Sequence, residues 1–247
     1  MKWDIITVTF NSSAQLQANW NWFREWSDRI NWIVVDNASG DDTAQVATLL
    51  GARVIQNSRN LGFGAGCNQG FWSSTSPFVL FANPDLRIKP EDLELLESTL
   101  DREECLVSAQ LLNSDGTLQI NGRGRPYLTA KLAHRGLIVF KPRLKKYLPK
   151  PTKNGIAEVT WIMGACVSTK RETFEKIGSW DETFFIYYED HDLGIRANHF
   201  GVKVLVDSRL TWRHEWARAT TSFNLFAWYH EIRSAIIFYK KYPELIR

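Results

Sequence analysis

The first half of the chain alternates short apolar runs with longer polar or amphipathic segments. The apolar runs are typical of strands, and the segments between them are typical of helices. Strands are expected at 4–10, 32–36, 53–56 and 78–82, and helices at 15–26, 41–50, 65–74 and 90–101. Short strands that alternate with helices predict an α/β fold whose mostly parallel central sheet is flanked by helices.

The second half has a less regular pattern. Strands are expected at 158–168 and 202–206, and helices at 171–177, 190–200 and 222–242. The last helix is rich in aromatic and apolar residues. We expect it to pack on the domain, although one aromatic face could rest on a membrane interface. No internal repeat or low-complexity linker divides the chain, so its 247 residues are expected to form one domain.

Polar side chains follow each of the first four expected strands. Ligands of parallel α/β sheets bind beyond the carboxyl ends of the strands, so these side chains are expected on one rim that can hold a base, a ribose and a diphosphate. The rim residues are Thr9, Asn11, Asp36, Asn37, Asn57, Asn60, Asn83 and Asp85. Each is also an ordinary turn former, and Asn83-Pro84-Asp85 taken alone favours a turn over a metal or phosphate site.

The glycine-rich stretch NLGFGAGCNQG, residues 60–70, follows the third expected strand. Its glycines are spaced unlike those of the dinucleotide-binding fingerprint or of a phosphate-binding P-loop. Close packing of a helix on the sheet explains them as well as an approach of backbone amides to a nucleotide does. The two roles are compatible, so both stay open.

Three carboxylates, Glu189, Asp190 and Asp192, follow a cluster of four aromatic residues at the start of an expected helix. Acids in the first turn of a helix can simply complement its dipole. An acid beside aromatic rings can also have the shifted pKa of a general base. His191, which stands between these acids, can be read as a residue of the helix surface.

The net charge of +3 conceals a strong asymmetry. Residues 1–116 carry 8 basic and 15 acidic side chains, residues 117–157 carry 10 basic and no acidic ones, and residues 158–247 carry 12 of each. This basic window, residues 117–157, is either a solvated surface or a contact for an anionic partner. A phosphorylated acceptor and a membrane face rank before nucleic acid, because no RNA-binding signature is present.

Other features of the sequence bound the class of protein. The N-terminus lacks the apolar core of a signal peptide, and no apolar run is long enough to cross a bilayer. We therefore expect a cytoplasmic protein, with a peripheral contact at the inner face of the membrane as a further option. Three scattered cysteines indicate neither a disulfide framework nor a zinc site.

An ordered set of motifs runs through residues 3–241: TVTFNS, IVVDNASGDDT, NLGFGAGCNQG, LFANPD, the segment from WIMGACVS to EDHDLGIRANHFG, and WRHE. This set resembles the inverting glycosyltransferases of family 2, in their rhamnosyltransferase-like branch. The resemblance implies a GT-A fold with a nucleotide-binding half (1–112), an acceptor-binding half (113–221) and a C-terminal helix (222–247). It implies transfer of a sugar, with dTDP-rhamnose favoured, from a nucleoside diphosphate donor to a cell-surface glycan or lipid-linked acceptor.

The resemblance also implies roles for individual residues. It assigns donor contacts to Thr9, Asn11, Asp36, Asn37, Asn60, Gly62, Asn68 and Asn83. Asp85 and His214 would bind Mg²⁺ or Mn²⁺ at the diphosphate, whose growing negative charge a divalent ion neutralises. Asp190, with Glu189 beside it, would take the proton of the acceptor hydroxyl from the opposite wall of the same cleft. Asn83 stands where many relatives carry a carboxylate, and the choice of base among the three acids stays open.

Two other classes of protein fit the sequence less well. A non-catalytic nucleotide-sugar-binding subunit of a glycan assembly complex would not need both Asp85 and Asp190. A nucleotidyltransferase shares the βα layout but is expected to carry a basic, glycine-rich loop early in the chain. Residues 7–15 contain neither Gly nor Lys.

Overall fold

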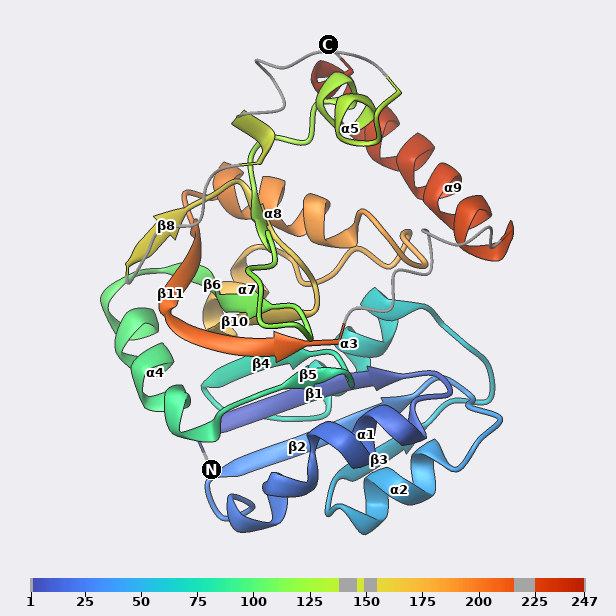
Figure 1. The fold of residues 1–247 in the computed structure, drawn as a ribbon, viewed down its shortest axis with the longest axis vertical. Helices are drawn as coiled ribbons and strands as arrows, with labels where there is room; N and C mark the ends of the chain where they lie inside the picture. The colour runs from blue at the N-terminus through green and yellow to red at the C-terminus, as the bar shows by residue number, and fades with distance from the viewer. Residues whose placement is uncertain (1, 138–145, 149–154, 216–224, 247) are drawn as a thin grey trace.

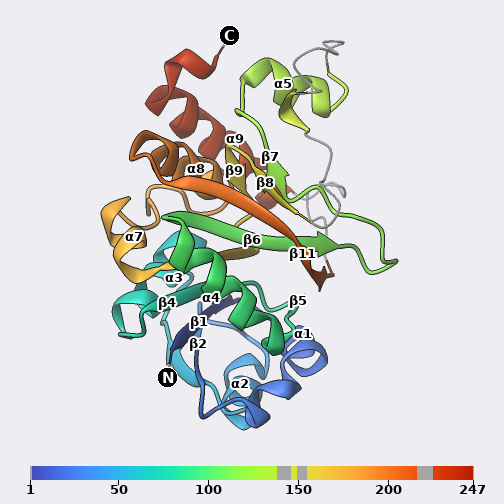
Figure 2. The same ribbon diagram turned by 90° about the vertical axis from the view of Figure 1, so that its left-hand side faces the viewer.

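The computed structural model describes residues 2–137, 146–148, 155–215 and 225–246 (Figures 1 and 2). The strands are β1 (Trp3–Thr9), β2 (Ile30–Asp36), β3 (Arg53–Gln56), β4 (Phe78–Ala82), β5 (Leu86–Arg87), β6 (Cys105–Leu112), β7 (Gly122–Arg123), β8 (Ile156–Glu158), β9 (Trp161–Ile162), β10 (Cys166–Lys170) and β11 (Lys203–His214). The α-helices are α1 (Ser13–Asn19), α2 (Thr43–Leu49), α3 (Phe63–Trp72), α4 (Leu93–Arg102), α5 (Leu128–His134), α7 (Arg171–Lys176), α8 (Glu189–His199) and α9 (Leu225–Lys241).

The central sheet joins the two halves of the chain. In the described part of the chain it has nine strands in the order β3-β2-β1-β4-β10-β6-β11-β5, with β8 paired to β11. β1 to β4 are mutually parallel, and β6 is parallel to β11. β10 is inserted antiparallel between β4 and β6. The predicted α/β class, with a mostly parallel sheet flanked by helices, is confirmed.

Helices cover both faces of this sheet, because alternate residues of each strand point to opposite sides. On one face, α1, α2 and α4 enclose a core that contains Trp20 and Trp32, whose rings stack 4.5 Å apart. On the other face, α3, α7 and α8 pack against residues such as Ile6 and Phe81. Figure 1 shows α9 and α5 beyond α8, in the part of the molecule farthest from β1–β3.

The glycines of α3 allow this helix to lie directly on the sheet. A Cβ atom at Gly70 would lie 2.5 Å from Ile6 Cγ2, and one at Gly66 would lie 2.8 Å from Val8 Cγ1. These distances are too short for non-bonded carbon atoms. Of the two roles that the sequence left open for the glycine-rich stretch, close packing therefore applies to Gly66 and Gly70.

Several elements differ from the sequence-based expectation. The strand expected at 158–168 is three short strands, because a turn at 163–165 separates β9 from β10. The strand expected at 202–206 runs on to His214 as β11, with an irregular register between Asp207 and Thr211. The helix expected at 15–26 ends at Asn19 and is followed by a 3-10 helix, Asn21–Glu25.

The start of the expected C-terminal helix, at 222–224, lies outside the described residues, and α9 is described from Leu225. Residues 138–145 and 149–154 of the basic window also lie outside them. Within the described ranges, no helix is both long and apolar enough to span a bilayer.

Candidate active site

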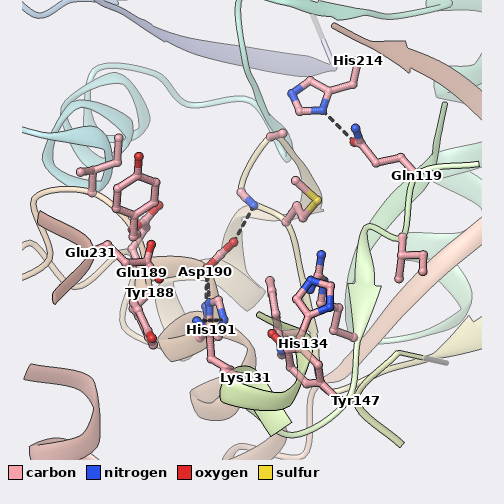
Figure 3. A pocket seen from close by; sticks show the side chains of 18 of the residues that line it. Gln119, Lys131, His134, Tyr147, Tyr188, Glu189, Asp190, His191, His214 and Glu231 are labelled. Carbon is pink, nitrogen blue, oxygen red and sulfur yellow. Dashed lines mark hydrogen bonds and ion pairs between the residues drawn. The ribbon is translucent and has the colours of Figure 1, made fainter. Parts of the chain in front are cut away.

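A cavity of about 850 Å³ brings together acids from both halves of the chain. Its lining includes Asn83, Asp85, Gln119 and His214, together with Lys131, Gly164, Glu189, Asp190, His191, Trp228 and Glu231. Figure 3 shows His214 and Gln119 on one side of this cavity and Asp190, His191 and Lys131 on the other. The cleft with two acidic walls that the sequence predicted is therefore present as a cavity.

The Asn83-Pro84-Asp85 stretch is a turn and also lines the cavity. The Leu86 amide donates to the Asn83 carbonyl at 3.1 Å, which closes the turn between β4 and β5. The Asn83 amide donates to the Ala165 carbonyl at 3.0 Å, which fixes the turn against the start of β10. The two readings of this stretch are thus compatible, since the turn itself directs Asp85 toward the cavity.

His214 is placed beside Asp85 by strand pairing, since it lies opposite Leu86 where β11 meets β5. Its Nδ1 lies 2.8 Å from Gln119 Oε1. Gln119 Nε2 donates to Asn113 Oδ1 at 3.0 Å, which orients the amide with its oxygen toward the histidine. An oxygen can only accept, so His214 carries a proton on Nδ1 and, in the neutral ring, presents the lone pair of Nε2.

His214 Nε2 and Asp85 Oδ1 lie 3.3 Å apart, and both are buried atoms that have no hydrogen-bond partner among the described residues. Two buried atoms that face each other in this way can share a cation: a proton on Nε2 would make the contact an ion pair, and a metal ion would bind both lone pairs. Adjacent ligands of an octahedral ion with bonds of about 2.1 Å are about 3 Å apart, so the pair fits a divalent ion such as Mg²⁺ or Mn²⁺. The described residues contain no cluster of three or more His, Cys, Asp or Glu side chains suited to a metal.

Asp190 is held firmly on the other side of the cavity. Its Oδ1 accepts hydrogen bonds from the His191 backbone amide at 2.8 Å and from His191 Nδ1 at 2.6 Å. Within the described part of the chain, its Oδ2 accepts only from the Gly164 amide, at 3.3 Å. Oδ2 is therefore the carboxylate oxygen with capacity left to accept a proton from a bound molecule.

His191 is buried, so its interpretation as a residue of the helix surface is wrong. Its ring stacks on Trp161 with a centroid distance of 3.6 Å. Its Nε2 lies 3.1 Å from Lys131 Nζ, which also lies 3.6 Å from the centre of the Tyr188 ring. Because the lysine can only donate, Nδ1 of His191 carries the proton that bonds Asp190. Lys131, His191 and Asp190 form a continuous chain of hydrogen bonds.

The environments of Glu189 and Asp190 shift their pKa values in opposite directions. Burial raises the pKa of Glu189 well above its usual range, and the charge of Asp190 adds to this rise. Burial also acts to raise the pKa of Asp190, but His191 and Lys131 more than offset it and the pKa is lowered. Two neighbouring carboxyl groups with pKa values pushed apart are typical of sites of acid–base chemistry. The opposite directions of these two shifts favour Asp190 as the anion and Glu189 as the protonated acid of the pair.

Asp192 belongs to another part of the structure. Its side chain is fully buried and bonds Arg196 Nε at 2.7 Å, Lys241 Nζ at 2.7 Å and the Tyr242 hydroxyl at 2.8 Å. It does not line the cavity. Asp192 connects α8 to the end of α9, so of the three acids whose roles the sequence left open it has a structural one.

Two strained residues direct the start of α8 toward the cavity. Tyr187 and Tyr188 have φ angles of 68° and 70°, in the left-handed region that bulky residues rarely adopt. Such residues cost about 1–3 kcal/mol each and persist only where packing holds them. The Tyr188 ring supplies that packing, because it contacts His191 at 4.9 Å and Phe238 at 5.2 Å between centroids.

The residues expected to contact the donor divide into two groups. Asn83 lines the cavity, whereas the residues after β1 and β2 form a rim outside its lining. There Thr9 Oγ1 donates to Asp36 Oδ1 at 3.1 Å, and the Gly40 amide donates to Asn11 Oδ1 at 2.7 Å. Ser39, which the sequence analysis did not select, also bonds Asp36 through its backbone amide, at 3.2 Å.

Asn37, Asn60 and Gly62 tie this rim to the start of α3. Asn37 Nδ2 donates to the Gly62 carbonyl at 3.0 Å, and the Gly62 amide donates to Asn60 Oδ1 at 2.9 Å. Gly62 has a φ of 93°, and a Cβ there would lie 2.4 Å from the Phe185 carbonyl oxygen. Only glycine fits this position, which connects the rim to the segment that precedes α8.

Asn68 was expected to contact the donor, but its amide is used within the protein. Nδ2 donates to the Trp180 carbonyl at 2.9 Å and to Glu182 Oε1 at 2.8 Å, and Oδ1 accepts from the Trp180 amide at 3.0 Å. The side chain is 4% exposed. These contacts give Asn68 a structural role, holding α3 against residues 180–182.

The overall arrangement is that of a GT-A glycosyltransferase. The structure superposes on TarS of S. aureus with a TM-score of 0.63 at 19% sequence identity, covering 88% of this chain and 37% of that chain. It superposes on GalNAc-T7, crystallised with UDP, GalNAc and Mn²⁺, with a TM-score of 0.65 at 14% identity, covering 87% of this chain and 44% of that chain. The chain thus spans less than half the length of either solved chain.

The sequence itself places the protein in a family. Residues 4–178 match the model of glycosyl transferase family 2, and the chain belongs to this family. The N-acetylglucosaminyl-diphospho-decaprenol L-rhamnosyltransferase of Mycobacterium tuberculosis is 25% identical over 233 residues, which cover 85% of this chain and 75% of that protein. The family expected from the ordered motifs, and glycosyltransferase activity as its class of function, are confirmed.

The buried state of His191 predicts an acid-sensitive fold. Burial, with Lys131 adding to it, lowers the pKa of His191 from 6.5 to about 4. The unfolded chain therefore takes up a proton between pH 6.5 and 4 that the folded chain does not. We expect this group to remove about 3 kcal/mol from the free energy of unfolding as the pH falls through that range.

Urea unfolding at several pH values measures this effect. His191→Gln should flatten the loss of stability below pH 6.5. The matched control is His199→Gln, an exposed histidine of the same helix. If the free energy of unfolding fell equally with decreasing pH in the wild type and in His191→Gln, His191 would not be kept neutral by the fold.

Proposed function

We propose that the protein transfers a sugar, with inversion, from a nucleoside diphosphate donor to a hydroxyl of a glycan or lipid-linked acceptor, and that the donor is dTDP-rhamnose. The observation that carries the proposal is one cavity with the Asp85–His214 pair on one side and Asp190 on the other. Rhamnose and a lipid-linked acceptor are supported by the name of the mycobacterial relative.

The proposed reaction follows from the two sides of the cavity. The acceptor oxygen attacks the anomeric carbon from the side of Asp190, and its proton passes to Asp190 Oδ2. The bond between the anomeric carbon and the phosphate oxygen breaks, and the nucleoside diphosphate leaves with the electron pair. His191 and Lys131 hold the Asp190 carboxylate in place and keep it ionised. A positioned general base typically contributes about 10²–10⁴-fold in rate.

The opposite side of the cavity would hold a divalent ion through Asp85 Oδ1 and His214 Nε2. When bound, such an ion neutralises charge on the leaving diphosphate. One carboxylate oxygen and one imidazole nitrogen form a mixed set, which suits Mn²⁺ better than the all-oxygen preference of Mg²⁺. The described residues offer these two side chains as ligands, and phosphate oxygens of the donor would supply others. Gln119 orients His214 for this role.

The same proposal assigns donor binding and acceptor binding to different parts of the chain. Residues 1–112 would bind the donor, with Asp36 and its partners Thr9 and Asn11 at the nucleotide. Residues 113–221 would bind the acceptor, and residues 222–247 would close that side. A peripheral position at the inner face of the membrane is proposed with it. A purely nucleotide-sugar-binding subunit would have no use for the preorganised carboxylate of Asp190.

A thermal-shift screen of nucleotide sugars, with and without Mn²⁺, tests this proposal. A donor at about 100 times its Kd adds about 2.7 kcal/mol to the free energy of unfolding, or about 5 °C or more in Tm. We expect dTDP-rhamnose with Mn²⁺ to give the largest shift. Asp85→Ala should lose the part of the shift that depends on Mn²⁺.

The matched control is Asp28→Ala, an exposed acid outside the cavity, which should keep the full shift. An equal shift by the donor in the wild type and Asp85→Ala would contradict the proposed metal ligand. A larger thermal shift with another nucleotide sugar would make that sugar the donor in place of dTDP-rhamnose. No shift with any nucleotide sugar would contradict the donor site.

A further inference from the structure

We propose that the outer face of α9 docks on an anionic lipid bilayer, so that the cavity takes its acceptor at a membrane surface. The outer face consists of Leu225, Phe226, Tyr229, Ile232, Arg233, Ile236 and Lys240. The inference rests on the proposed function in one respect, namely that the acceptor is linked to a lipid. It commits to phospholipid as the partner that covers this face.

The outer face is an apolar stripe that no described residue covers. Its large apolar side chains recur at helical spacing and are exposed by 72% at Leu225, 63% at Tyr229, 54% at Ile232 and 51% at Ile236. The opposite side of α9 is buried. A surface helix in water normally turns polar residues outward, so apolar residues on both sides of α9 indicate that something apolar meets the outer face.

Charge decides between a bilayer and a second copy of the chain. Arg233 and Lys240 lie within the stripe, are exposed, and form no ion pair with any described residue. The stripe contains no acidic residue. Two copies packed through this face would bring cations together without an acid to pair them. Anionic lipid headgroups would pair them while the apolar side chains enter the boundary with the acyl chains.

The same helix connects this face to the cavity. Trp228 and Glu231, on the side of α9 that faces inward, line the cavity. Arg135 of the basic window bonds Glu231 at 2.7 Å and lies 5.0 Å from the centre of the Trp228 ring. α9 therefore separates the acceptor side of the cavity from the proposed bilayer by the width of one helix. A sugar on a lipid diphosphate would reach Asp190 without leaving the membrane surface.

Vesicle co-sedimentation of the full chain tests the inference. The probes are vesicles of phosphatidylcholine alone and of phosphatidylcholine with phosphatidylglycerol. We expect binding to the anionic vesicles that weakens with salt. The triple variant Tyr229→Ser, Ile232→Ser, Ile236→Ser should lower the partition coefficient about tenfold or more, and Arg233→Ser with Lys240→Ser should lower it only on anionic vesicles.

The matched control is Leu49→Ser with Trp72→Ser, two residues that are each 60% exposed, on α2 and α3. It should bind vesicles like the wild type. Equal partition of the triple variant and the wild type would overturn the inference. So would light scattering that finds a dimer in the wild type and a monomer in the triple variant, since a second copy would then cover the face.

The outcome can be separated from that of the proposed function. The donor-dependent thermal shift does not involve the outer face, so the triple variant should keep it. Vesicle binding without any donor shift would support the docking face and contradict the function. A donor shift without vesicle binding would support the donor site and overturn the docking face.

Discussion

Replacing Asp190 by Asn is expected to abolish most of the transfer activity while leaving the donor bound. Asn keeps the shape of the side chain but cannot take the proton of the acceptor hydroxyl, so kcat should fall about 10²–10⁴-fold. The donor Kd, measured by calorimetry, should change little because Asp190 lies across the cavity from Asp85 and His214. The measurement is the initial rate of transfer at saturating donor and acceptor.

Glu189→Gln provides the comparison that identifies the base. Burial raises the pKa of Glu189, which favours its protonated form, and Gln is a neutral group of the same shape. We expect a much smaller loss of kcat than for Asp190→Asn. A larger loss in Glu189→Gln than in Asp190→Asn would make Glu189 the base. Unchanged turnover in Asp190→Asn would remove Asp190 from the reaction.

The parallel part of the fold could be predicted from the sequence because its signals are local. Each of the first four strands is a short apolar run that ends in a polar turn, and 53–56 and 78–82 match β3 and β4 at both ends. β6 was missed although all but the last of its residues are buried. Its signal was nevertheless present in the sequence, since residues 107–111 alternate apolar and polar and the polar stretch NSDG follows at 113–116. The antiparallel place of β10 between β4 and β6 depends on long-range pairing, which a local pattern does not encode.

The candidate site also contains residues that the sequence could identify and residues that it could not. Asp85 and Asp190 could be selected because each lies beside a recognisable boundary, a strand end and a helix start. Lys131 and Gln119 could not, because nothing near them in the sequence distinguishes them from other residues of the basic window. Their importance arises only from contacts with His191 and His214, which are 60 and 95 residues away. Side chains that orient another functional group carry no sequence signal of their own.

The buried Asp192 network predicts a large effect on stability and a small one on chemistry. Asp192→Ala would remove the carboxylate that Arg196 and Lys241 share, and leave the Tyr242 hydroxyl without its acceptor. Lys241 would keep its ion pair with Asp181, at 2.6 Å. Breaking a buried ion pair on one side costs about 3–5 kcal/mol, and because Lys241 remains partly exposed we expect about 3 kcal/mol. Urea unfolding measures this loss as a lower midpoint with an unchanged slope.

Asp101→Ala is the control, because Asp101 is exposed and makes one ion pair with Lys170, at 2.9 Å. It should cost less than about 1 kcal/mol. Well below its own midpoint, Asp192→Ala should retain transfer activity, since Asp192 lies outside the cavity. If Asp192→Ala instead kept the stability of the wild type and lost transfer activity, the assignment would be reversed. Asp192 would then be the base, and its contacts with α9 would not stabilise the fold.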